Sequence, residues 1–495
     1  MYGTILAERR TRAAASERAE PDHGASRREE QATTEAGRTV PTASGTGATL
    51  VIVGGGGFRV PLVYRALTDG PFAGLVSDVV LLDALPERAR AIARVLDAMP
   101  VAGGGPAPSV RVEARLEEAL PGADIVFAAV RSGGTEGRIL DERVALSAGL
   151  LGQETVGAGG ISYALRSIPD MMRVAAAMLD LAPDAWLINF TNPAGMVTEA
   201  VSSILGSRVI GICDSASGLI TRAARAAQVD LQGSLAGVDY VGLNHLGWLR
   251  GLDDGGGDRL PGLLADPLRL SGFEEGRLFG PDLLRVLGAL PNEYLFYYYF
   301  HREALLSIRS ADRTRGEILR DQQRGLYPGL AAADDPFAVW EDARRERESG
   351  YLAEARAADE QRDEADLAGG GYERVALQVM RALLTGTRSE LVLNVRNGST
   401  FPELPEHAVV EVPSVVDAGG ARPLPAAPLT PHQLGLMSAV KAVEQQTIRA
   451  AVQRDRDSAL WALAGHPLVD SFHAATRVLA GYEEAFPALK ASWAG

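Results

Sequence analysis

The chain has 495 residues, and its length predicts two or three lobes rather than one small core. A formal net charge of −14 argues against nucleic-acid binding, which needs clustered Lys and Arg. No apolar run reaches the roughly 20 residues of a spanning helix, so we expect no membrane association. The single cysteine, Cys213, excludes an internal disulfide and favours a reducing, cytoplasmic location.

The first 47 residues are rich in Arg, Glu, Ala, Ser and Thr and contain no apolar signal region. This composition is not that of a secretory signal, and the many Glu residues argue against an organellar transit peptide. We therefore expect residues 1–47 to form a disordered N-terminal tail.

A glycine-rich turn follows the first predicted strand. Residues 49–53 (TLVIV) form a β-branched run that favours a buried parallel strand, and the helical segment PLVYRAL comes shortly after it. Between them lies a run of four glycines, Gly54 to Gly57, followed by Phe58. Such a turn lets the backbone approach a pyrophosphate, whose charge the helix N-terminus stabilises.

The next predicted strand, DVVLLD, ends in Asp83. An acid at this place can accept hydrogen bonds from a ribose diol, as NAD requires. The match to the G-x-G-x-x-G pattern is incomplete, because Arg59 occupies the third glycine position. The order of strand, turn, helix, strand and acid predicts NAD binding, with a purely structural glycine turn as the alternative.

Polar residues follow two further predicted strands. Residues 123–130 (ADIVFAAV) precede Arg131, and AWLINF precedes Asn192. Ligands of doubly wound sheets bind at such carboxyl ends, where the Asn192 amide can face a nicotinamide ribose or a substrate hydroxyl. A plain turn initiator is the commoner meaning of Asn-Pro. The glycine-rich loop GQETVGAGG, residues 152–160, is either a ligand-contacting backbone or a tight structural turn.

A thiol and an imidazole also end predicted strands. Cys213 follows the apolar run VIGI, and His245 follows VGLN. The two side chains could converge on one metal ion, and the pair alone suits Zn²⁺ as well as other divalent metals. The alternatives are an inert buried cysteine and a satisfied core histidine; we favour the metal site.

Beyond residue 250 the pattern changes. GALPNEYLFYYYF (288–300) contains four of the twelve tyrosines, LVLNVRNGS (391–399) is a predicted strand, and the last 65 residues are predicted helices that pack back on the core. The predicted fold class is α/β: a Rossmann-like doubly wound sheet over residues 48–215, followed by a mainly helical α+β domain over residues 216–495 for substrate, metal and oligomerisation.

The ordered motifs as a set resemble the NAD- and metal-dependent family-4 glycoside hydrolases, and among these the 6-phospho-β-glucosidase branch. The resemblance covers residues 49–485 and is carried by GGGG…LLD, RSGGTEGRILDE, GLLGQETVGAGG, NFTNPAG, GICD, GLNHLGW, LPNEYLFYYY, TRGE and NVRNGSTFPELPEHAVVEVP. It implies NAD and Mn²⁺, or another divalent metal, as cofactors and a phosphorylated sugar as substrate. It also implies a homodimer or homotetramer.

The implied reaction differs from that of glycosidases with two catalytic carboxylates. NAD oxidises C3 of the sugar, C2 loses a proton, the aglycone is eliminated, water adds and the hydride returns. By resemblance, Cys213 and His245 hold the metal, Tyr294 is the base at C2, and Asp214 protonates the leaving oxygen.

The resemblance also assigns the binding residues. Substrate-contacting positions are Arg138, Glu154, Asn192 and, for the phosphate, Arg315. Cofactor positions are Gly54, Gly56, Gly57, Phe58, Asp83 and Arg131, with Gly57 standing where the family usually has serine.

Three alternatives stay open. The β preference rests on LPNEYLFYYY, whereas Asp214 favours an α-acting member, a 6-phospho-α-glucosidase or α-galactosidase. A lactate/malate-type 2-hydroxyacid dehydrogenase would share the TNP turn and the strand order, but the chain has no His-Gly-Asp turn. A non-catalytic NAD-binding sensor is the third alternative, because fold alone does not determine function.

Overall fold

The computed structural model describes residues 47–68, 70–101, 107–349 and 371–493. The predicted tail therefore lies outside the described residues, apart from Gly47. The described residues form one compact unit, and the predicted domain boundary after residue 215 stays a prediction. In the described part of the chain, no helix is both long and apolar enough to cross a membrane.

Six parallel strands form one half of the sheet. They are β1 (Ala48–Val53), β2 (Val76–Leu82), β3 (Ser109–Glu113), β4 (Ile125–Ala128), β5 (Trp186–Asn189) and β6 (Val209–Gly211). Their order in the sheet is β3-β2-β1-β4-β5-β6, with every pair parallel. This is the order of dinucleotide-binding sheets, whose ligands bind where the order reverses, here between β1 and β4.

Helices cover both faces of these strands, as alternation along β1 shows. Leu50 and Ile52 pack in the same apolar cluster as α2 (Val60–Thr68) and α3 (Pro86–Asp97). Val51 and Val53 belong to the opposite cluster, with α6 (Gly157–Leu181) and α7 (Ala194–Leu205). Because both faces are buried, the strand is a continuous apolar run, as the sequence predicted. The predicted doubly wound fold is confirmed.

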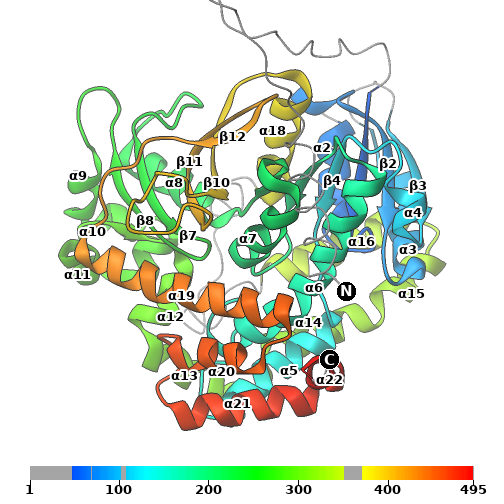
Figure 1. Cartoon of the computed structure of the whole chain (residues 1–495). Coiled ribbons are helices and arrows are strands. Elements are labelled where there is room, and N and C mark those ends of the chain that lie inside the picture. The colour runs from blue at the N-terminus through cyan, green and yellow to red at the C-terminus, as the bar shows by residue number, and fades with distance from the viewer. Residues whose placement is uncertain (1–46, 69, 102–106, 350–370, 494–495) are drawn as a thin grey trace, which may run out of the picture. The chain divides into compact units, whose positions relative to one another are not determined.

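The sheet continues beyond β6 with antiparallel strands from the second half of the chain. They are β10 (Ser389–Arg396), β11 (Val409–Asp417), β7 (Val238–Leu243), β8 (Leu246–Leu252) and β9 (Leu290–Pro291) in that order, with β12 (Gly420–Pro423) paired to β11. Figure 1 shows β7, β8, β10 and β11 together on the side of the molecule away from β2, β3 and β4. The two halves of the described chain thus share one twelve-stranded sheet.

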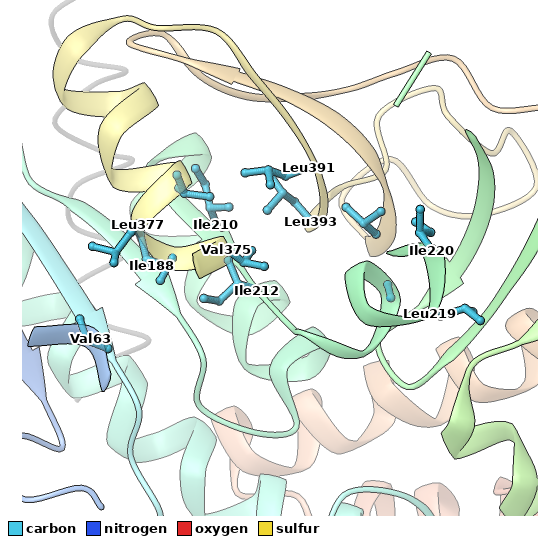
Figure 2. Close-up of a cluster of buried hydrophobic side chains, with 14 of the residues drawn as sticks. Val63, Ile188, Ile210, Ile212, Leu219, Ile220, Val375, Leu377, Leu391 and Leu393 are labelled. Atoms are coloured by element: carbon cyan, nitrogen blue, oxygen red, sulfur yellow. The ribbon is translucent and has the colours of Figure 1, made fainter. Parts of the chain in front are cut away.

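The seam between the two halves is apolar. Side chains of β5, β6 and β10 meet two helices there, α8 (Ser215–Ala227) and α18 (Tyr372–Thr385). Figure 2 shows this cluster, to which the strands contribute Ile188, Ile210, Leu391 and Leu393, and the helices Leu219, Ile220, Val375 and Leu377. Burial of each such side chain contributes roughly 1.5–3 kcal/mol, so the seam is held by its core.

The remaining helices surround the sheet. The C-terminal ones are α19 (Pro431–Gln453), α20 (Arg456–Gly465), α21 (Phe472–Ala485) and α22 (Pro487–Ser492), and they pack against α5 (Gly134–Ser147) and α6 (Figure 1). This confirms the prediction that the chain ends in helices folded back on the core. The others are α4 (Leu116–Ala119), α9 (Leu260–Leu264), α10 (Pro267–Leu270), α11 (Glu274–Leu287), α12 (Phe296–Tyr299), α13 (His301–Ser310), α14 (Arg315–Arg324), α15 (Leu326–Ala332) and α16 (Pro336–Ser349).

Candidate active site

The predicted cofactor turn connects β1 to α2. Gly54 has φ +92°, a left-handed conformation that favours glycine, and a Cβ there would lie 2.5 Å from the carbonyl oxygen of Ala129. The turn is closed by a hydrogen bond of 2.8 Å from the Gly57 amide to the Gly54 carbonyl. The backbone is therefore bare where a pyrophosphate would approach it.

The Asp83 carboxylate accepts hydrogen bonds from the backbone of this turn. Its Oδ2 accepts a hydrogen bond of 2.9 Å from the Gly56 amide, and its Oδ1 accepts one of 2.9 Å from the Leu85 amide. Each carboxylate oxygen can accept a second hydrogen bond, so the side chain can still receive a ribose hydroxyl. Two aromatic side chains also hydrogen-bond to the backbone of this turn. Tyr327 donates to the Gly56 carbonyl at 2.8 Å, and Trp340 donates to the Phe58 carbonyl at 2.7 Å.

The structure brings Cys213 and His245 together. Cys213 follows β6, and His245 lies in the two-residue turn between β7 and β8. The Cys213 Sγ and His245 Nε2 atoms are 3.6 Å apart, and both side chains are buried. For comparison, a tetrahedral Zn²⁺ ion, with a metal–sulfur bond of about 2.3 Å and a metal–nitrogen bond of about 2.1 Å, places its two ligand atoms about 3.6 Å apart. The donor pair therefore fits a divalent metal.

The protonation states of the two groups also suit a metal. Burial lowers the pKa of His245 to about 3, so the imidazole is neutral, as a ligand must be. Burial, followed by the charges of Asp214 and Glu411, raises the pKa of the Cys213 thiol, and a cation is needed to stabilise the thiolate. No third His, Cys, Asp or Glu joins them as a ligand group among the described residues. Substrate oxygens and water would have to complete the coordination shell.

Tyr294 and Asp214 lie beside this pair. The ring of Tyr294, in the short helix η3 (Glu293–Leu295), stacks on His245 with centroids 3.7 Å apart and planes inclined by 9°. The Asn292 side chain accepts a hydrogen bond of 3.1 Å from the Tyr294 amide and fixes the start of this helix. Asp214 Oδ1 lies 4.0 Å from the Cys213 Sγ, at the start of α8.

Asn192 contributes a buried acceptor at the adjacent strand end. It follows β5, which pairs with β6 in parallel, so the residues that follow these two strands emerge at the same edge of the sheet. The Asn192 Oδ1 atom is buried and has no hydrogen-bond partner within the described residues. Such an atom costs roughly 1–3 kcal/mol unless a ligand or water pairs with it. This position suits the predicted contact with a sugar hydroxyl or the nicotinamide ribose.

Glu154 connects two of the predicted arginines. It accepts a hydrogen bond of 2.7 Å from Arg138 and forms a close ion pair with Arg131. Burial by itself would raise the pKa of Glu154, but the two guanidinium groups lower it to about 2. The following residues, Thr155 and Val156, line the same cavity as His245. The charge of Glu154 also acts on His245, so the carboxylate that binds the two arginines lies near the imidazole.

Arg347 completes this positive region and was not predicted. Arg315, at the start of α14, donates to the Arg347 carbonyl at 3.4 Å, and the Arg347 guanidinium lies 4.9 Å from the centre of the Phe58 ring. Burial, then the charges of Arg59, Arg131, Arg315 and Arg138, lower the pKa of Arg347 to about 9. A bound anion would offset both the burial and the repulsion. The sequence carried no signal for Arg347, because it stands in a charged helix far from every recognised motif.

The predicted residues therefore form three adjoining groups in the described structure. The glycine turn with Asp83 is one, the arginines with Glu154 the second, and the pair Cys213 and His245 with Tyr294, Asp214 and Asn192 the third. Arg347 links the first two groups, and the loop that follows Glu154 links the second to the third.

Family comparisons agree with this arrangement. A model described as Family 4 glycosyl hydrolase matches residues 49–229, and a model described as Family 4 glycosyl hydrolase C-terminal domain matches residues 240–469. The chain belongs to glycosyl hydrolase family 4. This confirms the predicted family, and it favours the glycosidase over the dehydrogenase alternative.

Relatives of this family 4 chain include proteins named as 6-phospho-beta-glucosidases and proteins named as 6-phospho-alpha-glucosidases. A 6-phospho-beta-glucosidase of Escherichia coli strain K12 is 31% identical over 362 residues, covering 72% of this chain and 76% of the relative. A maltose-6'-phosphate glucosidase of Bacillus subtilis strain 168 is 27% identical over 428 residues, covering 82% and 88%. The solved 6-phospho-beta glucosidase of Thermotoga maritima with manganese, NAD+ and glucose-6-phosphate has a TM-score of 0.72 and 25% identity, covering 89% of this chain and 99% of that one.

Proposed function

We propose that this family 4 enzyme hydrolyses 6-phospho-β-glucosides by temporary oxidation of the sugar. Its cofactors are NAD and a divalent metal, for which Mn²⁺ is our first choice. The observation that carries the proposal is the 3.6 Å separation of Cys213 Sγ and His245 Nε2, with the Tyr294 ring stacked on the imidazole. The solved Thermotoga maritima relative, with manganese, NAD+ and glucose-6-phosphate, supports the choice of cofactors.

Each residue of the site has a separate role in the proposed reaction. NAD held at the glycine turn would supply a reversible hydride acceptor for the sugar, and a divalent metal held by Cys213 and His245 would supply a Lewis acid. The phenol oxygen of Tyr294 removes the proton from C2; a free phenol ionises only near pH 10, so a cation beside the ring favours the basic form. Asp214 donates a proton to the leaving oxygen at C1 and then removes one from the incoming water.

The arginine region binds the 6-phosphate in this proposal. Guanidinium groups match phosphate oxygens in a bidentate geometry. Arg138 is held by Glu142 at 2.7 Å and by Glu154, and Arg315 lies beside Arg347. The lowered pKa of Arg347 indicates a site that an anion would stabilise.

The preference for the β anomer has less support than the proposed reaction and its cofactors. LPNEYLFYYY and the Escherichia coli relative favour the β anomer. Asp214 and the maltose-6'-phosphate glucosidase relative favour an α-acting enzyme, which is the second candidate.

A substrate screen tests the proposal. The p-nitrophenyl α- and β-glucosides, each with and without a 6-phosphate, are incubated with the enzyme, NAD⁺, Mn²⁺ and a reductant, and nitrophenol release is followed. We expect release from the β-6-phosphate only, abolished by omitting NAD⁺ and by a chelator and restored by Mn²⁺, without net NADH. Release from the α-6-phosphate alone would favour the second candidate, and release without NAD⁺ would refute the mechanism.

A further inference from the structure

One row of paired residues crosses four strands next to the proposed metal site. Gly211 of β6 pairs with Asn394 of β10, Asn394 pairs with Glu411 of β11, and Glu411 pairs with Gly242 of β7. Cys213 lies two residues beyond the first member of this row, and His245 lies three residues beyond the last. The row therefore connects the two chain segments that carry the thiol and the imidazole.

Glu411 is the centre of a hydrogen-bond network in this row. Its Oε1 accepts hydrogen bonds of 3.1 Å from Asn394 Nδ2 and of 3.1 Å from Asn244 Nδ2, and its Oε2 accepts one of 2.9 Å from the Tyr240 hydroxyl. The side chain is 1% exposed. No Lys, Arg or His within the described residues forms an ion pair with it, so three neutral donors hold this carboxylate. A buried carboxylate is costly, and such networks occur where geometry must be fixed.

The network reaches His245 through its neighbour. Asn244 and His245 form the turn between β7 and β8, and His245 has φ +62°, a left-handed conformation unusual for a residue with a Cβ. Such a conformation is strained and persists only where the surroundings enforce it. The hydrogen bond from Asn244 to Glu411 anchors this turn to the neighbouring strand β11.

Glycines at both ends keep the row tightly packed. A Cβ at Gly211 would lie 2.7 Å from the Asn394 Cβ, and a Cβ at Gly242 would overlap the Gly247 Cα. The row's strands are consecutive in the sheet, in the order β6, β10, β11 and β7, and Figure 1 shows β7, β10 and β11 close together. The spacing of the two ligands therefore has little freedom to relax.

We propose that Glu411 is a positioning residue: through Asn394 and Asn244, its hydrogen bonds hold Cys213 and His245 at the separation that a divalent cation requires. The inference rests on the proposed function only in taking this pair as the metal site. Glu411 is the one charged residue among residues 409–416 (VVEVPSVV), but the sequence alone does not show which residues it binds.

Co²⁺ titration tests the proposal without a substrate, since a thiolate bound to Co²⁺ gives a charge-transfer absorption in the near ultraviolet. We expect Glu411→Leu to weaken Co²⁺ binding by about tenfold or more. Glu411→Gln should stay within about threefold of the unmodified enzyme, because its carbonyl oxygen can still accept from both asparagines. NAD⁺ affinity should stay within about twofold in both variants.

Glu483→Leu is the matched control. Glu483 is a mostly buried carboxylate that binds Arg456 between α20 and α21, so its loss should lower stability but leave Co²⁺ affinity unchanged. If Glu411→Leu does not fold, Asn244→Ala decides in its place, with the same tenfold loss expected.

Unchanged Co²⁺ affinity in the folded Leu variant, or in Asn244→Ala, would overturn the proposal. An equal loss in the Gln and Leu variants would also overturn it, because charge rather than hydrogen bonding would then matter. An unmodified enzyme without the thiolate absorption would refute the metal site of the proposed function itself.

Discussion

Tyr294 lies flat against His245, close enough to sense a cation held by that imidazole. We predict that Tyr294→Phe lowers kcat by about 10²–10⁴-fold, the usual contribution of a general base, while NAD⁺ affinity and KM change little. Steady-state kinetics with a 6-phosphoglucoside and NAD⁺ titration measure this. Tyr297→Phe is the control, since Tyr297 is a buried neighbour whose ring lies 6.2 Å from that of Tyr294. An active Tyr294→Phe enzyme with an inactive Tyr297→Phe enzyme would move the base to Tyr297.

The lowered pKa of Glu154 predicts that the protein loses stability in acid. Arg131 and Arg138 outweigh burial and lower its pKa in the folded protein to about 2, below the value of about 4.3 expected in the unfolded chain. A lowered pKa contributes stability that is present above the unfolded value and is lost as the pH falls towards the folded value. We expect a loss of about 0.6 kcal/mol between pH 6 and pH 4 that is absent in Glu154→Gln. Urea unfolding at both pH values measures it, and parallel pH slopes in the two proteins would contradict it.

At the scale of residues, the sequence predicted the site residues that lie in recognisable motifs. Cys213, His245 and Tyr294 come together although 32 residues separate the first two. Arg347 and Glu411 were missed because their partners lie on other elements: Glu411 binds Asn244, 167 residues away in the chain. Hydrogen bonds over such separations leave no periodic trace in one sequence.

The turn between β1 and α2 is the element on which cofactor binding depends. We predict that Gly54→Ala lowers NAD⁺ affinity by tenfold or more and destabilises the fold by about 1–2 kcal/mol. The added methyl group would face the Ala129 carbonyl at 2.5 Å in a left-handed backbone. Isothermal titration and thermal unfolding measure the two effects.

Gly435→Ala is the control for that substitution. Gly435 lies in α19 with open space around its Cβ position, so alanine should be neutral or stabilising by up to about 1 kcal/mol. Unchanged NAD⁺ affinity in Gly54→Ala would show that the turn does not hold the cofactor.

At the scale of elements, hydrophobic periodicity and composition predicted strands and helices, but they did not predict the order of all strands in the sheet. The parallel order β3-β2-β1-β4-β5-β6 follows from known rules for strands joined by helices. The insertion of β10 and β11 between β6 and β7 does not, because antiparallel pairing of distant segments depends on which apolar faces meet.

For the whole molecule, a buried lysine connects the C-terminal helices to the sheet. Lys441 of α19 donates to Glu199 of α7 at 2.9 Å and to the Val409 carbonyl of β11 at 2.7 Å, and it pairs closely with Glu444. We predict that Lys441→Met destabilises the protein by about 3–5 kcal/mol, because two buried carboxylates lose their cation.

Chemical denaturation measures this loss. Arg449→Met is the control, since Arg449 is 56% exposed in its ion pair with Asp455 and should cost less than about 1 kcal/mol. Equal stability of the two variants would show that Lys441 does not hold the C-terminal helices to the sheet.

In the proposed reaction, the glycosidic bond breaks after C2 of the sugar has lost its proton. The most direct measurement is hydrolysis of a 6-phospho-β-glucoside in D₂O with NAD⁺ and Mn²⁺, followed by NMR of the glucose 6-phosphate released. Deuterium at C2 of the product, with no lasting NADH, is the predicted result. A product that keeps only hydrogen at C2 would contradict the account.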